Sequence, residues 1–345
     1  MYNPTNTSNV VRELVTREQV FALFGGLGTP THNAVVDYLN EEKVPDLMVS
    51  SGSQAWGTEP KKRPMTFGWQ PDYVIEAKVI GSWIKENKPD AKVAVFAQDD
   101  DLGADGEQGL RQQLGDQVVA VAKYTPGNTD VAPQIAQLQA AKPDIVVGFN
   151  VPSYTALSQL VSKRLNFTPQ WIYTNVGADK TLVGGLLERF SEGKVKAAGG
   201  SALDGVMTTQ YIPNLENSDD PWTQLWQKVW KEHGNGKPLS NYKIYGMSQA
   251  YALTQVLHAT GQDLTRAGVV KTLEQQGASL EGPQLSPFRY SADSHLGIGG
   301  VRMIELGPDG SKQLTKVRVT DTADGPVTDS DEKHATPPAS GIPGS

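Results

Sequence analysis

A repeated pattern constrains the fold of this chain more than any other feature. Three times the chain passes from a Pro-Asp pair into a short apolar run that ends in polar residues; the runs are Leu47-Met48-Val49, Val93-Ala94-Val95-Phe96 and Ile145-Val146-Val147. Apolar runs of this length, each followed by a helical pattern, are typical of parallel strands buried on both faces. In open α/β sheets, ligands bind beside the carboxyl ends of such strands. The repeat therefore predicts an α/β fold and places a candidate site in the polar loops after the strands.

Length, charge and cysteine content exclude several classes of function. The chain has 345 residues, a net charge of −7 and no cysteine. The length favours two domains. The negative charge gives no electrostatic basis for binding nucleic acid or an anionic membrane. Without cysteine there is no disulfide, thiolate catalysis or Cys-ligated zinc. No apolar run is long enough to span a membrane, and the first residues lack the pattern of a signal peptide.

Helical and strand patterns alternate along the chain from about residue 9 to residue 164. Such alternation predicts βαβ units and a parallel sheet. Farther on, the patterns predict helices over 222–231 and 245–260, and a hairpin formed by 301–306 and 313–319 around Pro308-Asp309-Gly310. The last residues, 321–345, are mostly Thr, Asp, Pro, Ser and Gly, so we predict a disordered tail there.

The catalytic and metal motifs in the chain are incomplete. The segment 26–31 begins like a dinucleotide fingerprint but has Thr31 in place of the third glycine. Gly199-Gly200-Ser201-Ala202-Leu203 lacks the last glycine of a nucleophile elbow. The acidic run 99–106 has Gln112 where a calcium loop needs Glu, and the five histidines include no pair at a metal-ligand spacing. We therefore expect no catalysis, no cofactor and no metal.

Two groups of aromatic residues have different expected roles. Trp222, Trp226 and Trp230 recur every four residues, which predicts the packing face of a helix. Trp69 lies instead in a Gly/Pro-rich connection, where no regular element requires a packing stripe. A large rigid ring beside a cleft can cover an apolar ligand, so Trp69 is a candidate ligand-binding residue. Simple anchoring of the loop is the alternative role.

A series of motifs makes the chain recognisable as a relative of one family. The motifs are Val20-Phe21-Ala22-Leu23-Phe24-Gly25-Gly26-Leu27-Gly28-Thr29, Lys43-Val44-Pro45, Ser51-Gly52-Ser53-Gln54-Ala55-Trp56-Gly57, Phe67-Gly68-Trp69-Gln70-Pro71, Lys88-Pro89-Asp90-Ala91-Lys92-Val93-Ala94-Val95 and Tyr242-Lys243-Ile244-Tyr245-Gly246. In order and spacing, over about residues 2 to 320, they resemble the branched-chain amino acid (Leu/Ile/Val) type of ABC-importer substrate-binding protein. The resemblance implies the type I periplasmic-binding-protein fold: two doubly wound α/β lobes, joined by three crossovers, that close over a ligand cleft.

The resemblance also implies how the chain divides. Lobe 1 is expected to comprise 1–72 and 210–282, and lobe 2 to comprise 73–209 and 283–320, with 321–345 as the tail. Members of the family normally have a strand, a helix and a second strand before the segment that matches residues 2–7. We therefore expect this N-terminal strand-helix-strand segment to be missing here and lobe 1 to be incomplete. The same segment would carry the export signal.

The ligand carboxylate has an expected place in lobe 1. In amino-acid-binding members of the family, hydroxyls and main-chain N–H groups of two loops hold it. These loops fall on Gly28 and Thr29, and on Ser51, Gly52 and Ser53. Hydroxyl and backbone donors suit an anion, because charge-assisted hydrogen bonds are the strong ones.

The expected place of a ligand ammonium in lobe 2 departs from the family pattern. The family has an acidic residue there, whereas the position falls on Asn175 in this chain. An amide cannot offset a buried ammonium as a carboxylate can. We therefore expect a carboxylate without the amine, aliphatic or aromatic, in preference to leucine. Leu102, Asn150 and Tyr245 fall at other positions that face the cleft.

The resulting expectation is an extracytoplasmic receptor, periplasmic or anchored to the membrane as a lipoprotein, that delivers a small, partly apolar carboxylate or amino acid to an ABC permease. It would work by closure of the two lobes over the ligand. A ligand-sensing or regulatory domain of the same fold is the first alternative. A Rossmann-like enzyme is the second, and the incomplete motifs disfavour it.

Overall fold

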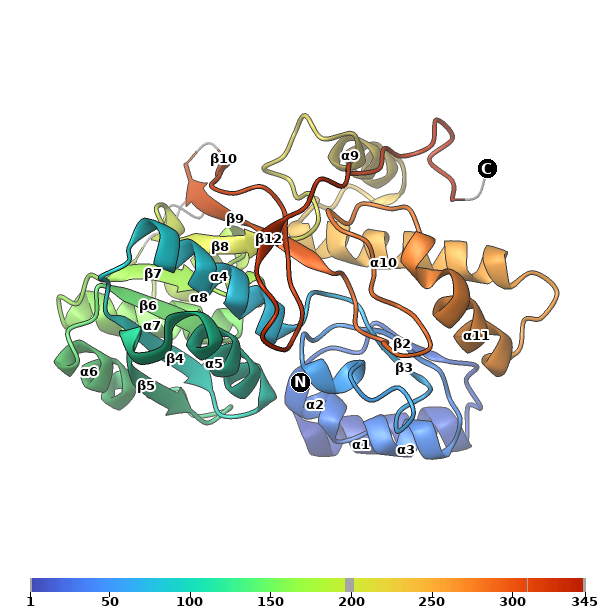
Figure 1. The fold of residues 1–345 in the computed structure, drawn as a ribbon, viewed down its shortest axis with the longest axis horizontal. Coiled ribbons are helices and arrows are strands. Elements are labelled where there is room, and N and C mark those ends of the chain that lie inside the picture. The colour runs from blue at the N-terminus through green and yellow to red at the C-terminus, as the bar shows by residue number, and fades with distance from the viewer. Residues whose placement is uncertain (1, 196–201, 309, 344–345) are drawn as a thin grey trace. The chain divides into compact units, whose positions relative to one another are not determined.

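A computed structural model describes residues 2–195, 202–308 and 310–343 of the chain, which form two compact units (Figure 1). Unit 1 comprises Met1–Asp72, Tyr211–Gly300 and Asp331–Ser345. Unit 2 comprises Tyr73–Gln210 and Val301–Ser330. Both units are therefore built from segments that lie far apart in the sequence.

The sheet of unit 1 in the described residues has three parallel strands in the order β1-β2-β3. The strands are β1 (Leu23–Phe24), β2 (Asp46–Val49) and β3 (Thr66–Gly68). β2 lies in the middle, with Asp46 opposite both Leu23 and Thr66. All four residues of β2 are buried, as the first Pro-Asp repeat predicts for a strand covered on both faces.

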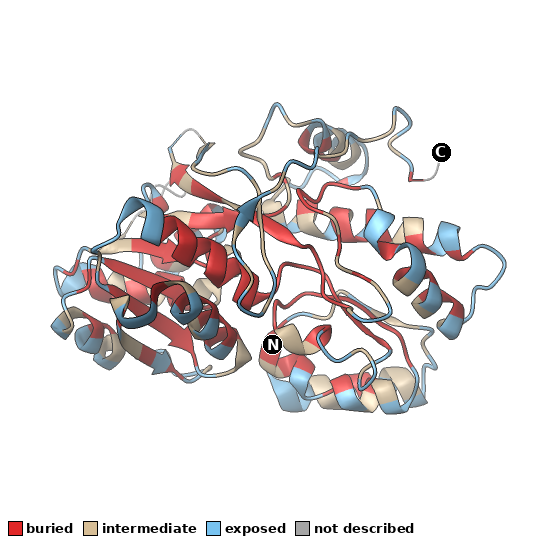
Figure 2. Cartoon of the chain, in the orientation of Figure 1, coloured by how far each residue is buried: buried red, intermediate tan, exposed pale blue. Residues whose placement is uncertain are grey.

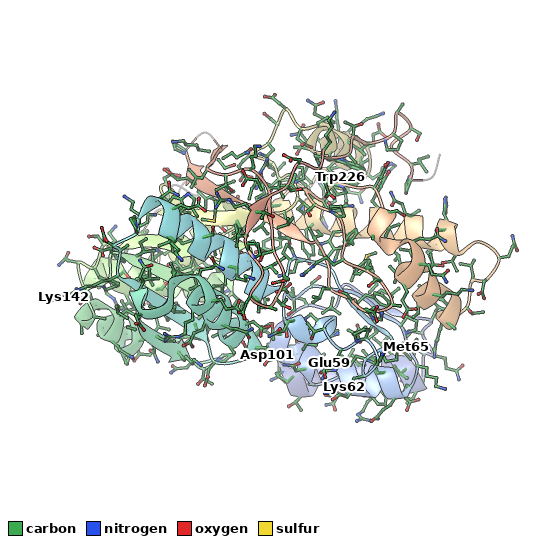
Figure 3. The ribbon with its side chains drawn as sticks, in the orientation of Figure 1. Glu59, Lys62, Met65, Asp101, Lys142 and Trp226 are labelled. Atoms are coloured by element: carbon green, nitrogen blue, oxygen red, sulfur yellow. The ribbon has the colours of Figure 1, made fainter. Side chains whose placement is uncertain are left out.

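The helices of unit 1 come from two separate parts of the sequence. The helices are α1 (Pro4–Thr16), α2 (Thr29–Asn33), α3 (Val36–Glu41), α9 (Pro221–His233), α10 (Asn241–Thr260) and α11 (Arg266–Gln276), with 3-10 turns η1 (Gln54–Trp56) and η5 (Gly277–Ser279). The predicted packing face of α9 is confirmed for Trp222 and Trp226, which are buried against Tyr251 of α10 with ring centroids 4.9 and 6.1 Å away. Figure 3 labels Trp226 on α9.

Unit 2 contains a larger mixed sheet in the order β12-β11-β9-β8-β7-β6-β4-β5, with β10 paired to β9. Its strands are β4 (Val93–Gln98), β5 (Val118–Tyr124), β6 (Ile145–Phe149), β7 (Gln170–Tyr173), β8 (Met207–Gln210), β9 (Gly300–Gly307), β10 (Gly310–Gln313), β11 (Arg318–Val319) and β12 (Thr328–Asp329). The strands from β5 to β8 pair in parallel, and β9 is antiparallel to β8. The second and third Pro-Asp repeats are confirmed as adjacent buried strands, β4 and β6, with Val95 opposite Val147.

The strand order of unit 2 reverses at β4, because β5 lies on one side of it and β6 on the other. Such a switch point is where open α/β sheets place their ligands. Two groups of helices pack on this sheet: α4 (Tyr73–Asn87) with α5 (Asp101–Leu114), and α6 (Ala132–Ala140) with α7 (Pro152–Arg164) and α8 (Lys180–Phe190). The strands between them are buried, whereas exposed residues lie on the outer faces of the helices (Figure 2).

The acidic run that resembles a calcium loop starts a helix. Asp101, labelled in Figure 3, is the first residue of α5, and the Asp100 side chain accepts a hydrogen bond of 2.9 Å from the Leu102 N–H. An aspartate at this position satisfies a backbone donor that the helix leaves free. Burial raises the pKa of the Asp100 carboxyl, and hydrogen bonds from Gln98 and Leu102 partly oppose the shift.

The structure differs from the expected lobes near the C-terminus. Residues 283–300, expected in lobe 2, belong to unit 1, where Leu285 N–H bonds to Tyr211 O at 2.8 Å and the Phe288 ring lies 5.2 Å from that of Trp69. The prediction of a disordered tail over 321–345 is also wrong, because Thr328–Asp329 forms strand β12 and the Trp222 side chain donates to Ala335 O at 2.7 Å. Composition alone could not show these partners, because composition carries no information about which residues pair; Trp222 and Ala335 are 113 residues apart.

Two predicted motifs fall partly outside the described residues. A hairpin forms at the predicted place, because β9 and β10 pair antiparallel with Gly310 opposite Gly307, but its second strand is Gly310–Gln313 and not 313–319 as predicted. Asp309 of its turn is not described. Residues 199–201 of the incomplete nucleophile elbow also lie outside the described part. Among the described residues, no helix is both long and apolar enough to cross a membrane.

Candidate ligand-binding site

Unit 1 brings two of the predicted hydroxyls into direct contact. Thr29 Oγ1 lies 2.8 Å from Ser51 Oγ, and each residue is 1 % exposed. Thr29 is the first residue of α2, which follows β1, and Ser51 follows β2. Because β1 and β2 are parallel neighbours, their carboxyl ends meet at one edge of the sheet. The pair offers two hydroxyl groups that can turn their hydrogens toward an anion.

The backbone around this hydroxyl pair is tightly constrained. Gly28 has φ +101°, which favours glycine, and a Cβ there would overlap the ring of Tyr2. Gly52 is buried, and the N–H of Ser53 donates to Ser51 Oγ at 3.3 Å. The Ser53 hydroxyl accepts from Ala55 N–H at 3.2 Å and thereby caps η1. Ser53 therefore has a structural role whether or not it also contacts a ligand.

The predicted aromatic residues of unit 1 form one cluster. Trp69 is fully buried, with its ring centroid 6.2 Å from that of Tyr245 and 5.2 Å from that of Phe288. The Trp69 Nε1–H is buried without a hydrogen-bond partner in the described residues, as is the amide nitrogen of Gln70.

Sequence analysis did not identify Gln249, one helical turn after Tyr245 on α10. Its amide nitrogen donates to Met48 O at 2.9 Å and to Ser50 Oγ at 3.0 Å. These bonds fix the end of β2 immediately before Ser51. The i, i+4 spacing of Tyr245 and Gln249, which places both on one face of α10, is the signal that could have found this residue.

Unit 2 brings together the loops that follow β6 and β7. Asn150, which follows β6, is fully buried and donates to Thr155 Oγ1 at 2.6 Å. Thr155 donates in turn to the carbonyl oxygen of Gly177, in the 3-10 turn η3 (Asn175–Gly177) that follows β7. Asn150 Oδ1 is buried without a partner in the described residues. Leu102 lies in the first turn of α5, which follows the adjacent strand β4, and is 1 % exposed.

The most unusual group in unit 2 is Glu76, which the sequence analysis missed. It lies in the first turn of α4 and is fully buried. Its carboxyl accepts hydrogen bonds from Thr174 Oγ1 at 2.6 Å, from Asn175 N–H at 2.8 Å and from the hydroxyl of Thr209. The signal in the sequence is a single acidic residue between apolar neighbours in Val74-Ile75-Glu76-Ala77.

The environment of Glu76 disfavours its charged form. Burial raises the pKa of the Glu76 carboxyl, and the hydrogen bonds from Thr174, Thr209 and Asn175 oppose the rise only in part. The side chain of Asn175 also favours the charged form, although its Nδ2 has no hydrogen-bond partner among the described residues. Perturbed carboxyls of this kind concentrate at functional sites.

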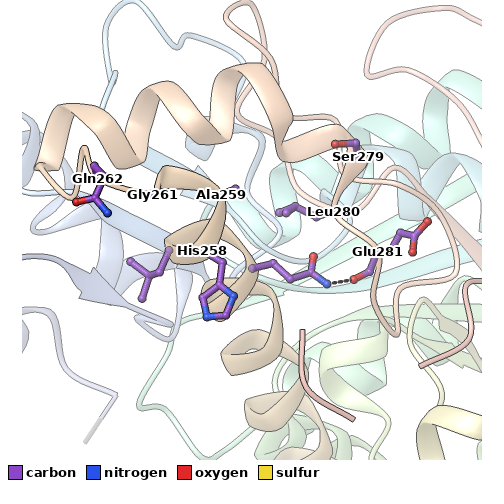
Figure 4. Close-up of a pocket in the computed structure, with 9 residues that line it drawn as sticks. His258, Ala259, Gly261, Gln262, Ser279, Leu280 and Glu281 are labelled. Atoms are coloured by element: carbon purple, nitrogen blue, oxygen red, sulfur yellow. Dashed lines mark hydrogen bonds between the residues drawn. The ribbon is translucent and has the colours of Figure 1, made fainter. Parts of the chain in front are cut away.

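A surface hollow of unit 1 does not involve any predicted ligand-binding residue. It lies beside the end of α10 and η5 and is lined by Gln255, Leu257, His258, Ala259, Gly261, Gln262, Ser279, Leu280 and Glu281 (Figure 4). Gln255 donates to the main-chain oxygen of Glu281 across it. Within the part of the chain that the structure describes, no three His, Cys, Asp or Glu residues gather in a way that could hold a metal ion.

Comparisons with known proteins agree with this architecture. Residues 1–313 match the family model described as periplasmic binding protein. A search of the curated proteins found no match.

Solved structures with the same fold include three with informative descriptions. A possible leucine/isoleucine/valine-binding protein from Rhodopirellula baltica is 20 % identical, with a TM-score of 0.76 over 91 % of this chain and 82 % of the other. A branched-chain amino acid ABC transporter protein from Thermus thermophilus with bound valine is 17 % identical, with a TM-score of 0.76 over 93 % of this chain and 84 % of the other. An ABC transporter solute-binding protein from R. palustris in complex with 4-hydroxybenzoate is 16 % identical, with a TM-score of 0.73 over 94 % and 85 %.

Proposed function

Because the chain belongs to the periplasmic binding protein family, whose members bind solutes rather than catalyse reactions, we propose that it is the solute-binding receptor of an ABC importer. Its ligand is a small, partly apolar carboxylate or amino acid. The receptor acts outside the cytoplasm, in the periplasm or anchored to the membrane as a lipoprotein. The ligand stabilises a closed arrangement of the two lobes, which the membrane permease then recognises.

The contact between Thr29 and Ser51 is the observation that carries this proposal. Two buried hydroxyls 2.8 Å apart at adjacent strand ends satisfy each other with only one hydrogen. The other hydroxyl hydrogen is available for an anion. A carboxylate fits such donors because its hydrogen bonds are charge-assisted.

The other proposed contacts fit a ligand with an apolar body. The Trp69 and Tyr245 rings supply an aromatic surface in unit 1, and Leu102 supplies an aliphatic one in unit 2. Asn175 and Asn150 add uncharged polar groups in unit 2. Valine and 4-hydroxybenzoate, bound by two proteins of the same fold, both combine a carboxylate with an apolar part. Since Asn175 is neutral, the amine-free carboxylate is the preferred ligand.

A thermal-shift screen followed by calorimetric titration tests the proposal. The ligands are matched pairs that differ only in the amine: leucine with 4-methylpentanoate, and phenylalanine with 3-phenylpropanoate. We expect at least one carboxylate to raise Tm and to bind with one site per chain. The amide analogue of the best ligand, which lacks the anionic charge, should bind much more weakly. If no carboxylate or amino acid binds, or if the amide binds equally well, the proposed ligand class is wrong.

A further inference from the structure

Glu76 joins three elements of unit 2 through one carboxyl group. Oε1 accepts from the backbone N–H of Asn175 and from Thr209, and Oε2 accepts from Thr174. The first turn of α4 is thereby tied to the loop after β7 and to β8. Thr174 is fully buried and Thr209 is 3 % exposed, so water does not share these bonds. The position of the proposed ligand residue Asn175 depends directly on this carboxyl.

The hydrogen bonds alone do not require an acidic residue. Threonine hydroxyls donate or accept, so a glutamine would find a partner for its amide nitrogen at Thr174 and still accept from Asn175 and Thr209. A carboxylate adds the cost of burying a charge, and within the described ranges Glu76 forms no ion pair that would offset this cost. A group that destabilises the fold without structural need points to a role in function.

We propose that Glu76 sets the charge of the ligand that the site accepts, and that an anionic ligand binds together with one proton, which adds to a carboxylate oxygen of Glu76. This inference rests on the proposed function. A carboxylate ligand that contacts Asn175 lies one residue from a buried carboxyl group, and two negative charges in such an environment repel strongly. Protonation of Glu76 removes the repulsion and leaves a neutral site.

Several other charged groups on α4 and on the elements packed against it form ion pairs of their own. On α4, Lys78 pairs with Asp321 and Glu86 pairs with Arg318 of β11. Glu107 of α5 pairs with Arg111, and Lys180 after η3 pairs with Asp204. The remaining charged groups on these elements, at their caps and on β9 are Lys85, Asp100, Asp101, Asp105, Asp179, Arg302 and Glu305; burial also raises the pKa of the Asp100 carboxyl, whose side chain caps α5. The segment β8 itself carries no titratable residue, and Glu76 is the carboxyl that accepts a hydrogen bond from the Asn175 N–H.

The sign of the pH dependence follows from this linkage. Below the pKa of Glu76 in the unliganded protein the carboxyl is already neutral, and an anion binds without proton uptake. As pH rises through that pKa, which burial raises, binding must be accompanied by protonation and the affinity for an anion falls. The affinity for the anion should fall by up to about 10-fold for each pH unit. The total fall should be about 10- to 100-fold, as expected for one charge pair in a partly buried site.

Titration calorimetry with 4-methylpentanoate between pH 6 and pH 9 tests the proposal. Runs in phosphate and in Tris at the same pH give the number of protons taken up, because the two buffers differ in ionisation enthalpy. For the natural sequence we expect uptake approaching one proton per ligand in the upper part of the range. Glu76→Gln should bind without proton uptake, independently of pH, at least as tightly as the natural sequence does at its acidic limit.

Two further variants separate charge from structure. Glu86→Gln makes the same substitution on the same helix at an ion pair with Arg318, and it should leave proton uptake unchanged. Thr209→Val removes one donor that favours the charged form, so the midpoint of the pH profile should move to higher pH. If Glu76→Gln does not fold, the Thr209→Val shift decides the question.

Equal proton uptake in the natural sequence and in Glu76→Gln, or binding that is independent of pH in both, would overturn the inference while leaving the proposed function intact. Absence of binding by any carboxylate at any pH would instead contradict the proposed function. A preference of Glu76→Gln for leucine over 4-methylpentanoate would also overturn the inference, because removal of a negative charge should favour the anion.

Discussion

Lys78 Nζ lies 3.1 Å from Oδ1 of Asp321, and the Lys78 side chain is fully buried. The same ammonium donates to the main-chain oxygens of Asp321, Ala323 and Gly325 at 2.9, 2.6 and 2.9 Å. A buried ammonium is tolerated only when its hydrogen bonds are satisfied. Residues 321–325 therefore form part of unit 2, where they supply four oxygens to one cation. These bonds also lower the pKa of the Asp321 carboxyl, with the hydrogen bond from Lys78 as the main cause.

Truncation of the chain after Thr320 should destabilise unit 2. The deletion leaves the Lys78 ammonium buried without its partners, and breaking a buried charge interaction in this way costs about 3 to 5 kcal/mol. Differential scanning calorimetry should show a clear fall in Tm. Truncation after Ser330 is the matched control, because it keeps all four oxygens around Lys78 and should cost less. Combining Lys78→Met with the longer truncation should recover part of the loss, and an unchanged Tm in the longer truncation would contradict this account.

Thr29→Ala should weaken binding of a carboxylate. Removal of one charge-assisted hydrogen bond costs about 1.5 to 3 kcal/mol, which corresponds to about 10- to 150-fold in Kd. Thr16→Ala removes an exposed hydroxyl that bonds only to its own helix, at Arg12 O, and serves as the control. Calorimetric titration of both variants with 4-methylpentanoate gives the comparison. A Kd for Thr29→Ala within twofold of that for the control would show that the Thr29 hydroxyl does not contact the ligand.

Asn175→Asp should shift preference toward amino acids. A carboxylate at this position attracts an ammonium and repels an amine-free anion. The ratio of Kd values for leucine and 4-methylpentanoate should therefore fall by at least about 10-fold relative to the natural sequence. Asn166→Asp, at an exposed turn of the same unit, controls for the added charge. Tight leucine binding that is unchanged in Asn175→Asp would refute the assignment of this position.

Glu76 and Glu86 should affect the stability of the ligand-free protein in opposite directions with pH. The pKa of Glu76 is raised by burial, so its contribution is fully present below the unfolded-state pKa and is lost as pH rises through the folded-state pKa. For Glu86, burial opposes the shift, but hydrogen bonds and the charge of Arg318 lower the pKa; its contribution is lost as pH falls. The free energy of unfolding, measured in urea from pH 4 to pH 8, checks both pH dependences.

In those unfolding measurements, Glu76→Gln should gain stability relative to the natural sequence as pH rises. Glu86→Gln should be less stable than the natural sequence near neutral pH and approach it in acid. Parallel pH profiles for the natural sequence and Glu76→Gln would show that Glu76 does not titrate between the folded and unfolded states in this range.

Local pattern was sufficient to predict the strands of the Pro-Asp repeats and the position of the polar loops that follow them. The Pro-Asp repeats lead into β2, β4 and β6, because uninterrupted apolar runs are stable only where both faces of a strand are covered. The hydroxyls of Thr29 and Ser51 meet because parallel neighbours end at the same edge of a sheet. Periodicity and the parallel-sheet rule are short-range or topological properties, and they can be read from residue order.

The tertiary structure alone revealed the burial and the hydrogen bonds of Glu76 and the order of the C-terminal segment. Glu76 bonds to Thr174 and Thr209, which are 98 and 133 residues away, and Lys78 bonds to Asp321, which is 243 residues away. In the sequence, both are single charged residues in a helix, where the usual expectation is an exposed side chain. Burial of a charge depends on which distant donors and acceptors packing brings within about 3 Å. The sequence thus determined these strands and the sheet edge where we propose a site, whereas packing determined which charged groups are buried.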